Sequence, residues 1–243
     1  MSDSGFLYRR LARLAPCVLP SVGIGGLALR DKYIVASARD VFLSAQYWRL
    51  FEFLETPPKL VVDLGAHCGH FAVLLHLLLL EKFRSDSAKY FLVEPAPKLV
   101  ETIRQTLDET GLTAQSLVLQ GLVGKRNGHA PFSAPSNNWL AGAVTTETSR
   151  ASGDTFPYVD LDAVLDTGPI DVLKVDVEGS EYELVDTYPN LFERARIVTM
   201  ELHGEKQKRT GIENRLAALG LRLVSTPIER GGEKMILLRR ADS

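Results

Sequence analysis

The sequence has few cysteines, no surplus of basic charge and no apolar run long enough to cross a membrane. Its only cysteines are Cys17 and Cys68, too few for a disulfide framework, which fits a reducing compartment. Lys and Arg number 28 against 30 Asp and Glu, so no overall positive field would hold a nucleic acid. The most apolar stretch, residues 71–80, is shorter than the roughly 20 residues that a spanning helix needs. We therefore expect a cytoplasmic protein that does not bind nucleic acid and has no transmembrane segment.

The 243 residues, 45% of them apolar, suffice for one compact domain with an N-terminal extension. Residues 1–58 are expected to form this extension as a cap. Its predicted elements are two short strands within residues 22–36 and a helix over residues 38–55, on which Val41, Ala45, Trp48 and Phe51 have helical spacing. Pro57 and Pro58 then end the cap.

From residue 59 to residue 243, strand and helix patterns alternate, which is typical of a parallel sheet. The predicted strands cover residues 60–64, 89–94, 116–123, 170–176 and 196–202. The predicted helices cover residues 69–83, 97–110, 160–166, 180–194 and 211–219. The chain closes with "LRLVST" and "KMILLRR" around "PIERGGE", a hairpin pattern. The fold class is therefore α/β, Rossmann-like, with a mostly parallel sheet, helices on both faces and a C-terminal antiparallel hairpin.

A glycine turn follows the first of these strands. Residues 60–70 read "LVVDLGAHCGH", so Asp63, Gly65 and Gly69 lie where a strand turns into a helix. A dinucleotide fingerprint, G-x-G-x-x-G, needs a glycine where His67 stands, because a side chain there would crowd a pyrophosphate. A ligand without phosphates, such as S-adenosylmethionine, fits better. The turn alone is also compatible with a plain strand-to-helix connection.

The second strand, "KYFLVEP", ends in Glu94. A carboxylate at the carboxyl end of this strand is placed to accept both ribose hydroxyls of a nucleoside. A solvated glutamate at a strand end is the simpler alternative. Pro95 and Pro97 stop the strand there and hold the carboxylate at the rim of the sheet.

Four further polar residues gather at strand ends. Lys174 and Asp176 interrupt the apolar strand in "DVLKVDVEGSE" and share one face by the period of two. Burying them costs several kcal/mol unless they pair with each other or with a ligand, so a structural ion pair and a functional role both remain open. The strand "VTMELHG" places Glu201 and His203 on one face of its own rim.

Together these segments resemble the FkbM family of S-adenosylmethionine-dependent methyltransferases. The resemblance covers roughly residues 60–204 and rests on "VVDLGAHCGHF", "FLVEPAP", "DVLKVDVEGSEYELV" and "VTMELH", with "YVDLDAVL" before the fourth strand. It implies the class I methyltransferase fold with a seven-stranded sheet. It also implies O-methylation of a hydroxyl on a sugar, glycolipid or polyketide-type natural product. The chain departs from the family at His67, where the first motif usually has asparagine.

The resemblance also implies roles for the residues singled out above. The cofactor would lie against Asp63, Gly65, Ala66, His67 and Gly69 with its methionine portion, and Glu94 would hold its ribose. The end of the third strand, residues 120–123, would flank the adenine. Asp176 would lie near the methyl group and the acceptor. The acceptor-facing loop would cover residues 125–158, in which Trp139 either stacks on the acceptor or pins the loop.

Methyl transfer to an alcohol requires alignment of donor and acceptor and removal of one proton. The candidate catalytic residues are Lys174, Asp176, Glu201 and His203, with His203 as general base oriented by Asp176 or Glu201. Asp176, Glu201 and His203 are alternatively a candidate site for a divalent metal that acidifies the hydroxyl. The expected partner is a small-molecule or glycan acceptor with a hydroxyl.

Two other classes of function share the fold. An NAD(P)-dependent oxidoreductase would also use Glu94, but the middle glycine is missing and no Tyr-x-x-x-Lys site is recognisable. A non-catalytic nucleoside-binding module would have no need of a buried Lys174, Asp176 or His203. Methyl transfer explains more of these residues than either alternative.

Overall fold

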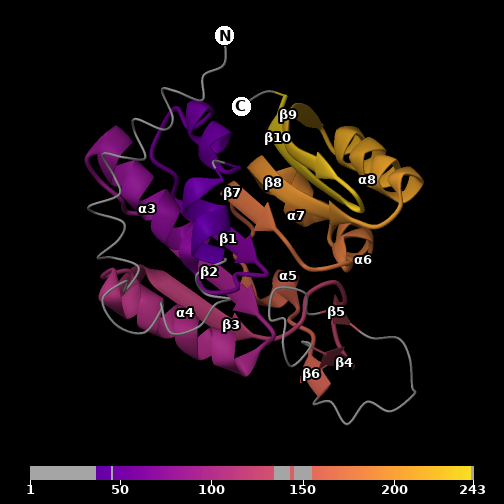
Figure 1. Ribbon diagram of the computed structural model, residues 1–243, viewed down its shortest axis with the longest axis horizontal. Helices are drawn as coiled ribbons and strands as arrows, with labels where there is room; N and C mark the ends of the chain where they lie inside the picture. The colour runs from indigo at the N-terminus through magenta and orange to yellow at the C-terminus, as the bar shows by residue number, and fades with distance from the viewer. Residues whose placement is uncertain (1–36, 45, 134–142, 145–154, 242–243) are drawn as a thin grey trace.

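A computed structural model describes residues 37–44, 46–133, 143–144 and 155–241 of the chain (Figure 1). The strands predicted within residues 22–36, and the residues Ala45 and Trp139, lie outside these ranges. None of the helices within them is long and apolar enough to span a membrane.

A seven-stranded sheet forms the centre of the described chain, in the order β3-β2-β1-β7-β8-β10-β9. Its strands are β1 (Leu60–Leu64), β2 (Lys89–Glu94), β3 (Ser116–Gln120), β7 (Ile170–Val175), β8 (Ala195–His203), β9 (Leu221–Arg230) and β10 (Glu233–Arg240). The first five strands run parallel, whereas β10 is antiparallel to both β8 and β9. This topology confirms the predicted fold class.

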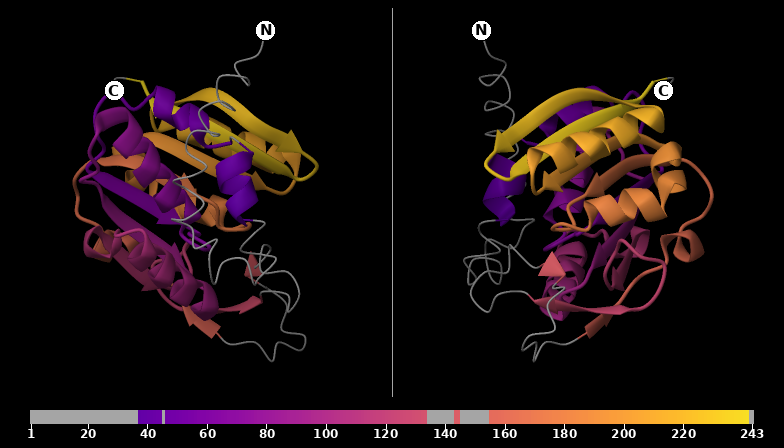
Figure 2. Two further views of the ribbon diagram at one scale, coloured as in Figure 1. Left: turned by 60° about the vertical axis from the view of Figure 1, so that its left-hand side comes forward. Right: turned by 90° about the vertical axis from the view of Figure 1, so that its right-hand side faces the viewer.

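Helices cover both faces of the sheet (Figures 1 and 2). The helices α3 (His70–Phe83) and α4 (Pro97–Glu109) share one apolar core with the N-terminal segment. The other core contains α5 (Leu161–Val164), α6 (Glu181–Thr187), α7 (Pro189–Arg194) and α8 (Lys206–Ala218). Because successive strand residues face opposite sides, Val62 and Leu173 pack in this second core, while their neighbours Asp63 and Lys174 face the α3 side.

The cap, which we define as residues 37–54 apart from residue 45, lies on the α3 side of the sheet. It contains a π-helical turn, η2 (Arg39–Leu43), and a 3-10 helix, η3 (Trp48–Glu52), so the prediction of one helix over residues 38–55 was wrong. Ser44 donates a hydrogen bond to the carbonyl of Asp40, a local bond that competes with helix continuation. Tertiary contacts then fix the second turn, since Lys82 of α3 donates to the carbonyls of Phe51 and Leu54.

The cap also reaches the C-terminal strands. Nη1 of Arg49 donates to the hydroxyl of Ser225 in β9 at 3.2 Å, and Glu55, just after the cap, pairs with Arg239 of β10 at 2.8 Å. The left view of Figure 2 shows the cap, in indigo, between α3 and the yellow strands at the C-terminus. It therefore closes one side of the space above the strand ends.

Several predicted boundaries differ from the observed ones. The helix predicted over residues 180–194 is two helices, because Pro189 cannot continue the helical bonding and the chain turns at Tyr188. The last helix begins at Lys206 rather than at residue 211. The third strand ends at Gln120, and the hairpin strands extend through "PIER" to a turn at Gly231 and Gly232.

The predicted loop over residues 125–158 contains a second, small sheet. Its antiparallel strands are β4 (His129–Ser133), β5 (Ala143–Val144) and β6 (Thr155–Pro157), in the order β5-β4-β6. The rings of Phe132 and Phe156 meet edge to face at 6.2 Å between β4 and β6. Strands this short show no clear period of two, which is why the pattern did not reveal them.

Candidate active site

The turn after β1 lies against the end of β7. Gly65 has a φ of +77°, and a Cβ built on it would lie 1.8 Å from the carbonyl oxygen of Asp176. Asp176 in turn donates its backbone N–H to the carbonyl of Leu64 at 2.9 Å. Only glycine allows this close approach of the two strand ends, so the glycine recognised in the sequence serves the packing of β1 against β7.

The N–H groups of this turn are bonded within the protein. Gly65 and Ala66 both donate to the carbonyl of Val93 at 3.0 Å, and His67 donates to Oε2 of Glu94 at 3.0 Å. His67 adopts a left-handed conformation, with a φ of +50°. A pyrophosphate site needs such N–H groups to point outward to the ligand. Here they point to β2, which leaves the turn without this cradle.

Glu94 ends β2 with a buried carboxylate. Besides the bond from His67, its Oε1 accepts the N–H of Ala96 at 3.0 Å. Burial raises the pKa of Glu94 to about 7, although the two backbone N–H groups favour the charged form. Each carboxylate oxygen retains a lone pair for a further donor, as two ribose hydroxyls would require.

Lys174 is buried and bonded on the same face of the sheet. Its Nζ donates to Oδ1 of Asp63 at 3.0 Å and to the carbonyl of Gly65 at 2.8 Å, and Oδ2 of Asp176 lies 3.8 Å away. Burial alone would lower the pKa of Lys174, but the charges of Asp63 and Asp176 outweigh it and raise that pKa. These contacts support the structural ion pair that the sequence left open, and they tie the glycine turn to β7.

His203, at the end of β8, is oriented by a residue that the sequence analysis did not consider. Its Nδ1 lies 2.8 Å from Oε1 of Glu181, the first residue of α6. Nε2 lies 3.5 Å from Glu178 and 3.8 Å from Glu201. Burial would lower the pKa of His203, but the hydrogen bond and charge of Glu181, together with Glu178, raise it to about 9.

The carboxylates around His203 crowd one another. Burial and the charge of Asp176 raise the pKa of Glu178 to about 8 and that of Glu201 to about 7. Ligand atoms of Asp176, Glu178 and His203 lie within 4.8 Å of one another, a spacing that would suit a divalent cation. In this candidate metal site, Glu178 therefore takes the position that the sequence analysis gave to Glu201. The run "DVEGSE" contains both Glu178 and Glu181, but only the fold shows that they meet β8.

A cavity of about 320 Å³ joins these groups above the strand ends. Its size lies within the range of small-molecule sites. Most predicted site residues line it: Gly65, Ala66, His67, Glu94, Lys174, Asp176, Glu201 and His203. Asp63 and Gly69 do not, since Asp63 lies behind Lys174 and Gly69 begins α3. Of the predicted adenine region, residues 121–123 line the cavity.

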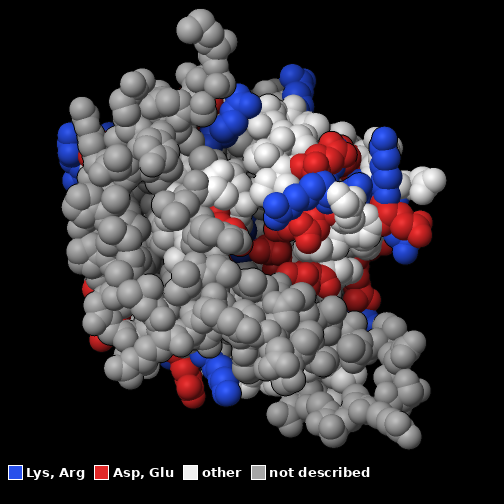
Figure 3. Space-filling view, in the orientation of Figure 1, with Lys and Arg blue, Asp and Glu red and all other residues white. Residues whose placement is uncertain are grey.

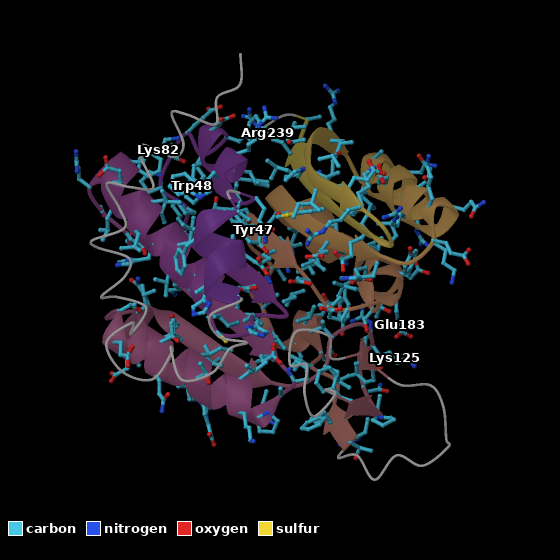
Figure 4. The ribbon with its side chains drawn as sticks, viewed as in Figure 1. Tyr47, Trp48, Lys82, Lys125, Glu183 and Arg239 are labelled. Atoms are coloured by element: carbon cyan, nitrogen blue, oxygen red, sulfur yellow. The ribbon has the colours of Figure 1, made fainter. Side chains whose placement is uncertain are left out.

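The cap supplies a wall of this cavity that the sequence analysis missed. Ser37, Asp40 and Tyr47 line it opposite the strand ends, and the hydroxyl of Ser37 lies 3.0 Å from Nδ1 of His70 on α3. In Figure 4, Tyr47 of the cap lies near strands β7 and β8. Acidic side chains gather near the middle of the face shown in Figure 3, with basic ones beside them.

Comparison with known proteins identifies the family. The model of the methyltransferase FkbM domain matches residues 63–223, about two thirds of the chain. The chain belongs to the FkbM methyltransferase family. The match includes the glycine turn, Glu94, Lys174 and His203, so the family domain contains the strand-end side of the cavity. The cap, residues 37–54, precedes the matched FkbM region.

No curated protein matches this FkbM chain significantly. Solved structures similar to it include a ribosomal protein L11 methylase from Lactobacillus delbrueckii subsp. bulgaricus, with 12% identity, 80% and 76% of the two chains covered and a TM-score of 0.48. A precorrin-6y C5,15-methyltransferase from Geobacter metallireducens has 12% identity, coverage of 81% and 87% and a TM-score of 0.47. TrmK from M. capricolum, in complex with S-adenosylhomocysteine, has 10% identity, coverage of 80% and 68% and a TM-score of 0.42. At these identities and scores, their acceptors say nothing about the acceptor of this FkbM chain.

Proposed function

We propose that this FkbM-family methyltransferase transfers a methyl group from S-adenosylmethionine to a hydroxyl oxygen of a small molecule or glycan. The observation that carries the proposal is the placement of two groups on one cavity. Glu94 and the glycine turn form one end, suited to a nucleoside, and His203 with its oriented imidazole forms the other. The acceptor hydroxyl would therefore enter beside Asp176, Glu201 and His203.

The residues at the nucleoside end fit S-adenosylmethionine. Glu94 would hold the ribose, Gly65 to His67 would lie against the methionine portion, and residues 121–123 would flank the adenine. When bound, this cofactor supplies a methyl group that is already electrophilic. The protein therefore has to position the two reactants, exclude water and handle one proton.

The turn itself argues against a nicotinamide dinucleotide. Its N–H groups from Gly65 to His67 are bonded to Val93 and Glu94 and are not free to cradle a pyrophosphate. An oxidoreductase on this fold would need that cradle. A non-catalytic binding module would not need an oriented histidine at the opposite end of the cavity.

His203 is the proposed general base. Glu181 holds Nδ1, so Nε2 is the nitrogen directed toward the carboxylates that line the cavity. In other enzymes that activate a hydroxyl, the general base is likewise held in place by a hydrogen bond from a further side chain. The earlier assignment of Asp176 or Glu201 as the orienter is replaced by Glu181. Asp176 and Glu201 are left to contact the acceptor.

A divalent metal is the second candidate mechanism, favoured by the spacing of Asp176, Glu178 and His203. These residues would hold the ion, whose charge would acidify the acceptor hydroxyl. Glu181 would then fix the ligating histidine, as carboxylates commonly do behind metal-bound imidazoles. Activity that survives a strong chelator would exclude this version.

Calorimetry with S-adenosylmethionine and with NAD tests the choice of cofactor. We expect binding of the former and none of the latter. Mass spectrometry of sugars, glycolipids and macrolide alcohols incubated with the protein and S-adenosylmethionine then tests the reaction. A mass increase of one methyl group identifies the acceptor, and binding of NAD alone would contradict the proposal.

A further inference from the structure

A second pocket, of about 600 Å³, lies at the end of the sheet opposite the candidate active site. It is lined by residues 53–56, by the end of α7, by the starts of β7 and β8 and by the end of β10. His203 ends β8, whereas Arg196 and Ile197 line this pocket near the start of the same strand, so the two sites are about 20 Å apart. The proposed methyl transfer makes no use of this second pocket.

Arginines predominate in the charged lining of this second pocket, which we call the arginine pocket. Its charged residues are Arg194, Arg196, Arg239, Arg240, Glu55, Asp171 and Glu193. Positive charge is therefore in excess among the residues that line it. In Figure 4, Arg239 lies on the side of the molecule away from Lys125 and Glu183.

Three of these arginines each donate hydrogen bonds through a single nitrogen in the described part of the chain. Nη1 of Arg196 bonds Asp171 at 2.9 Å, and Nη2 of Arg239 bonds Glu55 at 2.8 Å. Nη1 of Arg194 donates only to two backbone carbonyls of the loop before β7, and Arg194 pairs with no carboxylate in the described ranges. Because a guanidinium carries five N–H donors, most donors of these three side chains are available to a ligand.

Arg240 has a structural role instead. Its three nitrogens donate to the carbonyls of Phe192, Ala195 and Leu219. These bonds hold the end of β10 against α7 and against the start of β8. The neighbouring Arg194 and Arg196 therefore project from backbone that is fixed in place.

Arg239 has an unmet demand for a hydrogen-bond acceptor. Its Nε is buried and has no partner in the described part of the chain, and an unpaired buried donor destabilises a fold. Its carboxylate partner, Glu55, is 73% exposed, so solvent weakens their ion pair. An anion that displaced Glu55 would accept hydrogen bonds from Nε and Nη2 together, which is the paired geometry that arginine forms best.

We propose that the arginine pocket binds a phosphate ester through Arg194, Arg196 and Arg239. A carboxylate needs only one guanidinium, as the pairs made by Glu55 and Asp171 show. A phosphate group has three terminal oxygens and a larger charge, so it can accept hydrogen bonds from several guanidiniums at once. The donors left over on the three arginines fit this larger group.

The arginine pocket also has apolar lining that suits the organic part of such an ester. Its apolar residues are Phe53, Leu54, Pro169 and Ile197. The volume of about 600 Å³ lies within the range of small-molecule sites and exceeds that of a phosphate group. The ligand class is therefore an organic phosphate, carried either by a soluble ester or by a lipid head group.

Calorimetry on the full-length protein with phenyl phosphate tests the arginine pocket, without S-adenosylmethionine and in a buffer free of phosphate and sulfate. We expect saturable binding that weakens as salt is added. Arg196→Gln and Arg239→Gln should each weaken it at least about tenfold, the scale of lost hydrogen bonds between charged groups. Arg104→Gln is the matched control, because it removes the same charge from an exposed position on α4 outside the pocket. It should change the affinity by less than about twofold.

Glu55→Gln should have the opposite effect. It removes the carboxylate that competes with the ligand for Arg239, so phenyl phosphate should bind about two to five times more tightly. Its control is Glu52→Gln, since Glu52 pairs with Arg49 at 3.7 Å and does not line the pocket. The control should leave the affinity unchanged. Thermal unfolding identifies an arginine variant that fails to fold, in which case Glu55→Gln still tests the pocket.

Sedimentation with phosphatidylcholine vesicles, with and without phosphatidic acid, separates the two sources of the phosphate. Cosedimentation that requires phosphatidic acid and is lost in Arg239→Gln would assign the pocket to a lipid head group. Binding of phenyl phosphate without such cosedimentation would assign it to a soluble ester.

Two results would overturn the proposal for the arginine pocket. One is the absence of both saturable binding and cosedimentation. The other is binding that Arg196→Gln, Arg239→Gln and Glu55→Gln all leave unchanged. Because these measurements contain no S-adenosylmethionine, either result would leave the proposed methyl transfer intact.

Discussion

Lys174 and Asp63 lie opposite each other in the neighbouring strands β7 and β1, and Nζ of Lys174 is 3.0 Å from Oδ1 of Asp63. Both side chains are almost completely buried. Because the lysine also bonds the carbonyl of Gly65, this ion pair connects the second half of the sheet to the glycine turn after β1. Its loss should affect the whole fold as well as the site.

Lys174→Met should lower the free energy of unfolding by about 3–5 kcal/mol, because it leaves Asp63 charged and buried without its partner. Lys174→Met combined with Asp63→Asn should recover much of that loss. Urea unfolding measures both. The control Lys125→Met breaks an exposed pair with Glu183 and should cost less than about 1 kcal/mol. Equal losses in the two lysine variants would contradict the structural role of Lys174.

Gly65→Ala should lower the free energy of unfolding far more than Gly111→Ala does. Both glycines have left-handed backbones, with φ of +77° and +74°, so both substitutions carry the strain of about 1–2 kcal/mol for a side chain there. Only at Gly65 does the new Cβ meet another atom, the carbonyl of Asp176, whereas nothing lies within 4 Å at Gly111. We expect a total loss above about 4 kcal/mol for Gly65→Ala. Similar melting temperatures for the two variants would show that the close approach is not rigid.

Glu94→Ala should weaken binding of S-adenosylmethionine by about 1.5–3 kcal/mol, the scale of hydrogen bonds to a charged group. The variant also frees the N–H groups of His67 and Ala96, so its melting temperature has to be measured alongside the calorimetry. Glu101→Ala, an exposed position on α4, is the control and should bind as the wild type does. Unchanged affinity in Glu94→Ala would remove Glu94 from the site.

If His203 is the base, activity should rise with pH, reach half of its maximum near pH 9, where the raised pKa of His203 lies, and level off above it. The sign follows from the chemistry, because only the neutral imidazole accepts a proton, and the neighbouring carboxylates favour the charged form. His203→Ala should lower turnover by about 10²–10⁴-fold, abolish this limb and keep the affinity for S-adenosylmethionine within about tenfold. Wild-type turnover in the variant, with or without chelator, would contradict both the base and the metal version.

The strands and their faces could be predicted from the sequence because their signals are local. Apolar runs set the bounds of β1 and β2, and the period of two placed Lys174, Glu201 and His203 on their faces. The start of α8 was not predicted. Its N-terminal residue, Glu205, makes no capping hydrogen bond with its side chain, so the sequence carries no capping pattern at this point.

The missed site residues depend on contacts between distant parts of the chain. Glu181 and His203 are 22 residues apart, and only the packing of α6 against β8 brings them to 2.8 Å. Tyr47 belongs to a cap whose second turn is held by contacts with Lys82 and Ser225, not by its own periodicity. The sequence pattern could identify the charged residues at the strand ends, but not the distant residues that orient them or pack over them.

The cap lines the cavity but lies outside the matched FkbM region. Tyr47 and Asp40 precede the matched region, whereas Glu94 and the glycine turn lie within it. Substitutions in the short segment 37–54 can therefore reshape one side of the reaction chamber without disturbing the residues proposed to hold the cofactor. Two proteins that share residues 63–223 closely can thus differ in this wall and, under the proposed function, in the shape of acceptor that fits against it.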